Sequence, residues 1–173
     1  CIVWLQPPDR RLRRSRRKLW PGDQEALIFF KELPLTAKPT IEDFNARAKG
    51  HFPAHLGIEL TEIGERSVTM EMAVRPELLA PNNYLHAGAI ITLADTAAGY
   101  GCLSNLPEGA LSFTTIELKS NFLGTARDGL LRCVATAAHL GGRTHIWDSV
   151  VTHVETEKTL ALFRCTQMIL WPK

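Results

Sequence analysis

One carboxylate, Asp95, interrupts a run from Ala87 to Leu103 that is otherwise almost entirely apolar or small. An unpaired carboxylate is costly to bury, and perturbed carboxylates concentrate at functional sites. Polar and flexible residues gather at the start of the run, namely Asn82, Asn83, His86 and Gly88. Because a helix N-terminus offers backbone N–H groups and a positive dipole end, this start could stabilise developing negative charge.

The elements that must position these residues follow from the periodicity of the chain. The apolar run predicts one helix of about 17 residues, which needs other elements around it because it is apolar on nearly every side. A short helix is expected over 40–49, and alternating residues predict a hairpin from the strands 57–63 and 67–74. Four more strands are predicted over 114–122, 129–140, 144–155 and 159–170, with Gly141-Gly142 as a turn. This order fits an α+β fold in which a sheet curls around one central helix.

Residues 1–35 differ in composition from the rest of the chain. The formal net charge is only +2, yet seven arginines and lysines fall within residues 10–18. Such an arm can bind nucleic acid or an anionic membrane, or serve as a transit-like segment. It lacks interleaved aromatic residues and any nucleic-acid module, so we expect no nucleic-acid partner. We expect 1–35 to be a basic, disordered or non-native extension and 36–173 to be one domain.

The cysteines and the apolar run exclude further classes of protein. The four cysteines, at positions 1, 102, 133 and 165, are far apart and form no CxxC pair. Neither a zinc site nor a disulfide framework is predicted, and reduced thiols fit a cytoplasmic protein. The run from Ala87 to Leu103 comes closest to a membrane span, but Asp95 at its centre would cost about 2.5 to 3.5 kcal/mol on an insertion scale. We therefore expect no metal and no membrane partner.

Two segments carry a resemblance to a known family. The stretch Asn82 to Gly88, followed by Thr92 to Ala97, resembles the signature of hotdog-fold acyl-coenzyme A thioesterases of the PaaI (phenylacetate-pathway) type. The segment 121–126 and the turn at 142–144 are similar to the same family, and together they cover residues 50–170 approximately. The resemblance implies a hotdog fold, a curved antiparallel sheet wrapped around one long central helix. It also implies hydrolysis of an acyl-CoA to free acid and CoA without a cofactor.

The resemblance also implies roles for individual residues. A backbone N–H at Ala87 or Gly88 would polarise the thioester carbonyl, and Asp95 would attack the thioester or activate a water. Thr115 matches a hydroxyl-bearing position on the following strand. The family commonly has two glycines after the histidine, so the methyl group of Ala87 bears on acyl size and approach while the N–H donor is retained.

Substrate contacts are expected from residues that also have ordinary structural explanations. Asn82, or else Asn83, would orient substrate or water, although both are common turn residues. His86 could contact substrate or simply cap the helix, and Arg143 could bind a CoA phosphate or remain a solvated surface charge. Lys119 and Arg127 are further candidates for phosphate contacts, and Tyr84, Leu85 and Phe113 could line a tunnel for a medium-chain or aryl group.

The spacing along the helix bears on assembly. Ala87 and Asp95 are eight residues apart, or about 12 Å along one helix, so one chain cannot easily bring both to one carbonyl. The resemblance implies a homo-oligomer, a dimer or tetramer, with each site shared between two subunits. A non-catalytic acyl-binding or scaffold module is the alternative, in which Asp95 is a structural carboxylate. A dehydratase is disfavoured, since His86 and Asp95 lie too far apart within one chain to act as an acid/base pair.

Overall fold

An 18-residue helix, α4 (Ala87–Ser104), is the central element of the computed structural model, which describes residues 39–172. Nine of its residues are buried, on several sides of the helix, as the apolar run predicts: Ala89, Ile90, Leu93, Ala94, Ala97, Ala98, Gly99, Gly101 and Cys102. The expectation for residues 1–35 lies outside the described residues.

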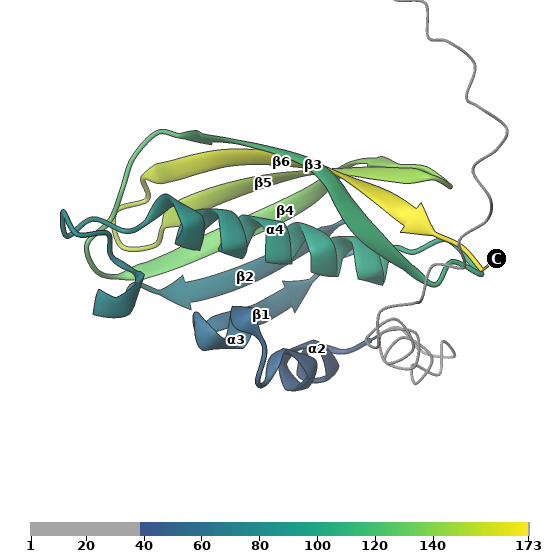
Figure 1. The fold of residues 1–173 in the computed structure, drawn as a ribbon, viewed down its shortest axis with the longest axis horizontal. Helices are drawn as coiled ribbons and strands as arrows, with labels where there is room; N and C mark the ends of the chain where they lie inside the picture. The colour runs from purple at the N-terminus through teal and green to yellow at the C-terminus, as the bar shows by residue number, and fades with distance from the viewer. Residues whose placement is uncertain (1–38, 173) are drawn as a thin grey trace, which may run out of the picture. The chain divides into compact units, whose positions relative to one another are not determined.

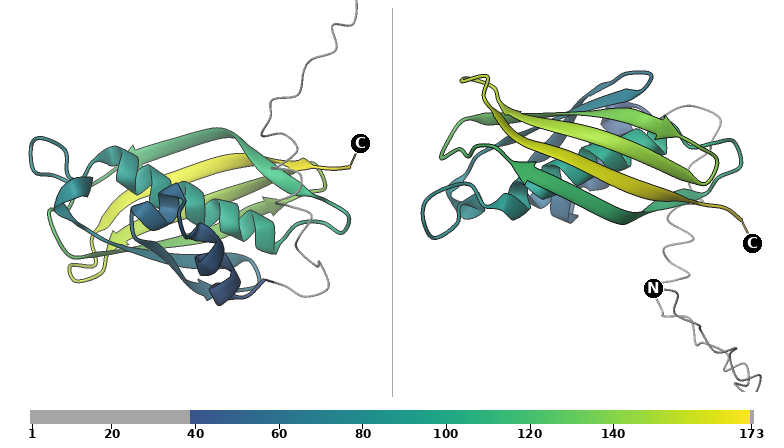
Figure 2. Two further views of the ribbon diagram at one scale, coloured as in Figure 1. Left: turned by 60° about the horizontal axis from the view of Figure 1, so that its bottom comes forward. Right: turned by 90° about the horizontal axis from the view of Figure 1, so that it is seen from above.

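Six antiparallel strands form one sheet, and α4 lies along one face of it (Figure 1). The strands are β1 (Ile58–Ile63), β2 (Ser67–Ala73), β3 (Ser112–Phe122), β4 (Leu130–Leu140), β5 (Thr144–His153) and β6 (Thr159–Leu170). Their order is β1-β2-β4-β5-β6-β3, so β1 and β3 are the edges. Figure 2 shows the strands curving past α4, while no described helix covers the opposite face. The predicted α+β hotdog architecture is confirmed.

Alternating burial in the strands builds the core beneath α4. In β2 the side chains of Val68, Met70 and Met72 are buried, which confirms the predicted one-sided hairpin. Trp147 in β5 is fully buried on the same inner face. The hydroxyl of Ser149 donates to the backbone oxygen of Ala94 at 3.2 Å, which ties the middle of α4 to β5.

Two short helices precede the sheet and close one side of the core. The helix α2 (Ile41–Ala48) lies within the range predicted for a short helix and begins with a capping box, because Thr40 Oγ1 accepts from the Asp43 amide while the Asp43 carboxylate accepts from the Thr40 amide. α3 (Phe52–His55) was not predicted. It is a single turn with proline in its first turn, which leaves almost no periodic pattern to detect.

A bulge in β3 corrects the predicted alternation of that strand. Strict alternation over 114–122 puts Thr115 on the face opposite Leu118. The register instead shifts between Thr115 and Glu117, so Ile116 is an extra residue. Thr115 pairs with Gln167 and Leu118 with Cys165, and both partners are buried on the inner face. Thr115 faces α4, as its hydrogen bond to Asp95 shows, and the bulge brings Leu118 to the same face.

Further features bear on the function classes considered above. No helix within residues 39–172 is long and apolar enough to cross a membrane. Cys102, Cys133 and Cys165 are free and buried. In the same part of the chain, no three His, Cys, Asp or Glu residues are placed to hold a metal ion.

Candidate active site

Asp95 lies in the middle of α4, partly buried, where the helix faces β3. The Thr115 hydroxyl donates to Asp95 Oδ1 across 3.3 Å. Burial raises the pKa of Asp95, and the Thr115 hydrogen bond partly offsets this by stabilising the ionised form. A carboxylate with a raised pKa holds a proton more readily than a solvated one, which suits a general base.

The other polar side chains in this part of α4 are satisfied by their own helix. Thr92 Oγ1 donates to the Gly88 oxygen at 2.8 Å, and Thr96 Oγ1 donates to the Thr92 oxygen at 2.6 Å. Asp95 is the only acidic residue of α4. Unlike the two threonines, the Asp95 side chain makes no hydrogen bond to its own helix, Ala87–Ser104; its partner, Thr115, comes from β3. Asp95 is therefore the polar side chain in this part of α4 that can interact with a ligand.

The start of α4 exposes one backbone donor. His86 is the N-cap residue, and its Nδ1 accepts from the Gly88 amide at 2.9 Å. A Cβ on Gly88 would lie 2.9 Å from the same nitrogen, so a larger residue here would displace the His86 ring from the cap. The Ala87 amide has no hydrogen-bond partner among residues 39–172. Of the two predicted donors, the Ala87 amide is therefore the one available to an oxyanion, and His86 has the capping role.

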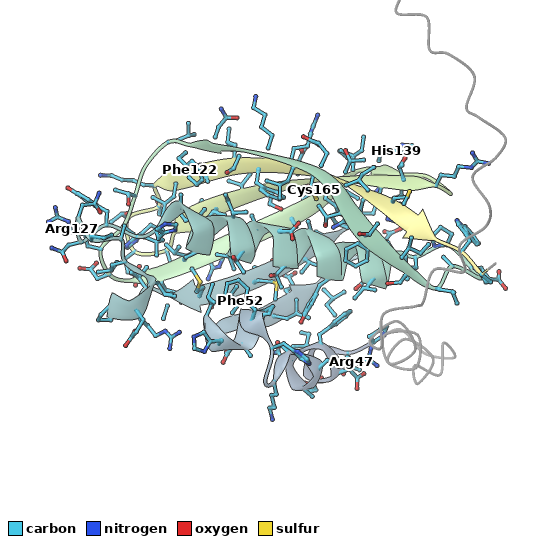
Figure 3. All side chains as sticks on the ribbon, in the orientation of Figure 1. Arg47, Phe52, Phe122, Arg127, His139 and Cys165 are labelled. Atoms are coloured by element: carbon cyan, nitrogen blue, oxygen red, sulfur yellow. The ribbon has the colours of Figure 1, made fainter. Side chains whose placement is uncertain are left out.

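An apolar groove of about 490 Å³ opens beside this helix start. It is lined by residues of the loop before α4, the first turn of α4 and the end of β3, among them Tyr84, Leu85, Ala87, Ile90 and Phe122. Arg127 stacks over the Tyr84 ring, 4.2 Å from its centroid. Figure 3 places Phe122 and Arg127 at this same end of the domain.

Phe113 lies away from this groove. A Cβ on Gly99 would be only 3.0 Å from the Phe113 ring, which places that ring against the second half of α4. Within one chain, Phe113 therefore does not share a groove with Tyr84 and Leu85. Leu85 and Tyr84 are brought together with the helix start as expected.

The two asparagines shape the loop that leads into α4. Asn82 Oδ1 accepts from the Tyr84 amide at 3.2 Å, and Asn83 has a left-handed backbone with φ of 61°. Both side chains are exposed. Asn82 also lines the groove, so its amide group can still reach a ligand there.

The basic candidates are distributed over different parts of the domain. Arg143 lies in the β4–β5 turn, where its backbone oxygen accepts from the Ile169 amide at 2.9 Å. This turn is at the far end of β4 from the groove, so one chain does not bring Arg143 to Ala87. Lys119 lies on the outer face of β3, in a second hollow with Asp148 and Arg164. Arg127 alone of the three is beside the helix start.

Sequence reasoning missed Gln167, which is fully buried on β6 next to Thr115. A glutamine in a strand whose two faces are both partly apolar gives no clear signal in the sequence. The alternation of β6 could have placed it inward only once Phe163 and Ile169 were known to face the core.

The family model of the thioesterase superfamily matches residues 82–160, which contain α4 and β3 to β5. The 1,4-dihydroxy-2-naphthoyl-CoA hydrolase of Listeria monocytogenes is 32% identical over 111 residues, covering 64% of this chain and 89% of the relative. The chain belongs to the thioesterase superfamily. The acyl-coenzyme A thioesterase PaaI of Escherichia coli is a further superfamily relative, 32% identical over 110 residues, covering 63% of this chain and 75% of that protein.

A solved thioesterase structure from Pseudomonas aeruginosa shares the fold. It aligns with a TM-score of 0.73 and 28% identity, covering 78% of this chain and 96% of that one. Thioesterase superfamily membership and the hotdog fold therefore agree. The family match contains α4 and β3 to β5, and the structural match extends over 78% of the chain.

Proposed function

We propose that this protein hydrolyses an acyl-CoA thioester to a free acid and CoA, with Asp95 as the base or nucleophile. The observation that carries the proposal is the partly buried carboxylate of Asp95, which accepts a hydrogen bond from Thr115 of β3. Asp95 lies on the same helix, α4, that presents the free Ala87 amide. The helix therefore offers one group to activate an attack and one to stabilise the resulting oxyanion. Membership in the thioesterase superfamily supports this assignment.

The chemistry has two forms that these residues can support. Asp95 takes a proton from a water that attacks the thioester carbon, or its oxygen attacks that carbon to give an anhydride that water then cleaves. In both, the carbonyl oxygen becomes an oxyanion that accepts from the Ala87 amide, and the CoA thiolate leaves. The α4 dipole adds to the stabilisation at that position.

An aromatic acyl group is the substrate we propose to test first. The groove beside Ala87 is largely apolar and has Tyr84 and Phe122 in its walls, which suits a planar ring. The Listeria relative is named for an aromatic acyl group. We also propose the narrower PaaI-type assignment, which the PaaI relative supports at similar identity. Arg127, which stacks over the Tyr84 ring, is a candidate contact for a CoA phosphate.

We propose a homodimer, alone or within a tetramer, as the active form. The edge strand β3 exposes the apolar side chains of Ile116, Leu118 and Phe122, and an uncovered edge strand favours pairing with another chain. The separation of Ala87 and Asp95, about 12 Å along α4, requires a second chain to complete each site. A second copy at β3 would supply the missing half.

The proposal is tested by thiol release from short, medium, long and aryl acyl-CoA thioesters, comparing the wild type with Asp95→Asn. We expect a loss of at least about a hundredfold in kcat, because the remaining amide cannot serve as base or nucleophile. Asp148→Asn is the matched control, since Asp148 pairs with Arg164 on the outer face. Absence of release from every thioester by the wild type would favour a non-catalytic acyl-binding module.

Mixing two inactive variants tests whether the site is shared. Ala87→Pro removes the amide donor and Asp95→Asn removes the carboxylate, so a mixed dimer with a shared site has one intact site. Random exchange should restore about a quarter of the wild-type activity, because half of the dimers are mixed and each has one working site of two. No recovery after verified subunit exchange would show that each site lies within one chain.

A further inference from the structure

The carboxamide of Gln167 is fully buried, and neither its nitrogen nor its oxygen has a hydrogen-bond partner within residues 39–172. A buried amide without partners typically costs about 1 to 3 kcal/mol. Such a group in the middle of a strand, where an apolar residue would pack without this cost, indicates a role other than packing.

The strand register restricts which side chains Gln167 can serve. On β6 it lies between β3 and β5, paired with Thr115 on one side and His145 on the other. Cross-strand partners project from the same face of a sheet, here the inner face beneath α4.

His145 is already satisfied. Its Nδ1 lies 3.3 Å from Cys102 Sγ, and the ring also hydrogen-bonds to the backbone of Gly141. Burial lowers the pKa of His145 and raises that of Cys102 to about 12, so both groups are neutral near neutral pH. This leaves Thr115 as the cross-strand neighbour that can use the Gln167 amide.

We propose that Gln167 is a positioning residue for hydrolysis, whose amide N–H reaches Thr115 Oγ1 through one bridging water. A hydroxyl has one proton to donate and two lone pairs to accept with. When this contact from Gln167 occupies a lone pair of Thr115 Oγ1, the hydroxyl proton of Thr115 is directed to Asp95 Oδ1. The distance between Thr115 Oγ1 and Asp95 Oδ1 is 3.3 Å. The inference rests on the proposed role of Asp95.

Few other ionisable groups bear on this region. Cys165 on β6 and Cys102 on α4 are thiols whose pKa is raised to about 12 by burial, so they remain neutral through the acidic range. His145, whose pKa is lowered by burial, lies with Nδ1 beside Cys102 Sγ and is neutral over most of the range above that pKa. Asp95 is thus the group whose titration reports on Thr115.

The test is Gln167→Met, which keeps the length of the side chain and removes both polar atoms. We expect an unchanged or higher melting temperature, an unchanged KM and a kcat about tenfold lower, the size of one lost hydrogen bond. The acid limb of the kcat profile should move to higher pH, because a poorly directed Thr115 stabilises ionised Asp95 less. An unaltered kcat and pH profile would overturn the proposal.

Two further measurements separate this role from its alternatives. In a Thr115→Val background Gln167→Met should have no additional effect on kcat, and a full additional loss would contradict action through Thr115. A carboxyl NMR titration of Asp95, assigned with Asp95→Asn, needs no turnover. If the wild type hydrolyses nothing yet the Asp95 titration still moves in Gln167→Met, only the proposed function fails; an unmoved titration removes the Gln167 proposal.

Discussion

The two ends of α4 are built for different purposes. At its start, Ala87 is exposed beside a groove, and the cap is made by one histidine side chain. In its second half, Gly101 lies so close to Trp147 that an added Cβ would be 2.6 Å from the ring. The rear of the helix is locked against the sheet, and the front is left open to a ligand.

This difference shows how one helix can hold a reactive group in place. A donor or carboxylate must keep its position to within a fraction of an ångström to be effective, yet the site itself must stay uncovered. The close glycine–aromatic packing behind Asp95 supplies the rigidity that the exposed first turn lacks. Changes at the front should therefore alter activity, and changes at the rear should alter stability.

The largest effect is expected at the front, from Ala87→Pro. Proline is tolerated at the first helical position but has no N–H, so kcat should fall by about a hundredfold to a thousandfold while the melting temperature changes little. Ala87→Gly is the matched control because it keeps the donor. Equal activity of the proline and glycine variants would exclude this amide from the reaction.

At the rear, Gly101→Val should destabilise the fold by about 2 to 3 kcal/mol, because the added side chain would overlap Trp147. Urea unfolding measures this change, and thiol release from the folded fraction should be nearly normal. Gly142→Ala serves as the control, since nothing lies within 4 Å of a Cβ there. A folded Gly101→Val protein with normal stability would contradict the locked rear.

A smaller effect is expected from His86→Ala at the cap. Loss of the bond from the Gly88 amide to Nδ1 should lower the free energy of unfolding by about 1 kcal/mol. The loss of kcat should be well below that of Ala87→Pro, because the Ala87 amide remains. His55→Ala, an exposed histidine, is the control. A kcat loss as large as that of Ala87→Pro would instead assign His86 a direct part in the reaction.

The smallest effect concerns the pH dependence of stability. Burial raises the pKa of Asp95 in the folded state, so folding favours its protonated form. The wild type should therefore lose stability relative to Asp95→Asn as pH rises through the folded-state pKa, and the two should converge at lower pH. Melting temperatures of the wild type and of Asp95→Asn over that pH range test this prediction. A wild type that gains stability relative to Asp95→Asn as pH rises would contradict it.

The sequence predicts the elements well where one pattern is long. The run containing Asp95 gives α4 to within one residue of its observed end, since a 17-residue stretch that is almost entirely apolar or small apart from Asp95 allows no other element of that length. The predicted strand β6 matches its observed bounds, Thr159–Leu170. These patterns depend on burial repeated along the chain, which a sequence displays directly.

The site is less predictable because it depends on local breaks in those patterns. Strict alternation over 114–122 puts Thr115 and Leu118 on opposite faces of β3, whereas the extra residue Ile116 lets both face inward. The Gly88 amide donates to the side chain of His86, two residues earlier, and this cap geometry is what leaves the Ala87 amide as the free donor. A bulge and a cap each depend on a few neighbouring residues and produce no repeating pattern in the sequence, so they are harder to predict.

The edge position of β3 also has a consequence for dosage. Only β6 pairs with it in the described part of the chain, so its outer edge can add a strand from a second copy. If that copy completes the site, the fraction of working enzyme depends on how much chain is present. Well below the dissociation constant, the rate would rise with the square of the chain concentration. Halving expression would then lower output by more than half, so abundance itself would regulate the reaction.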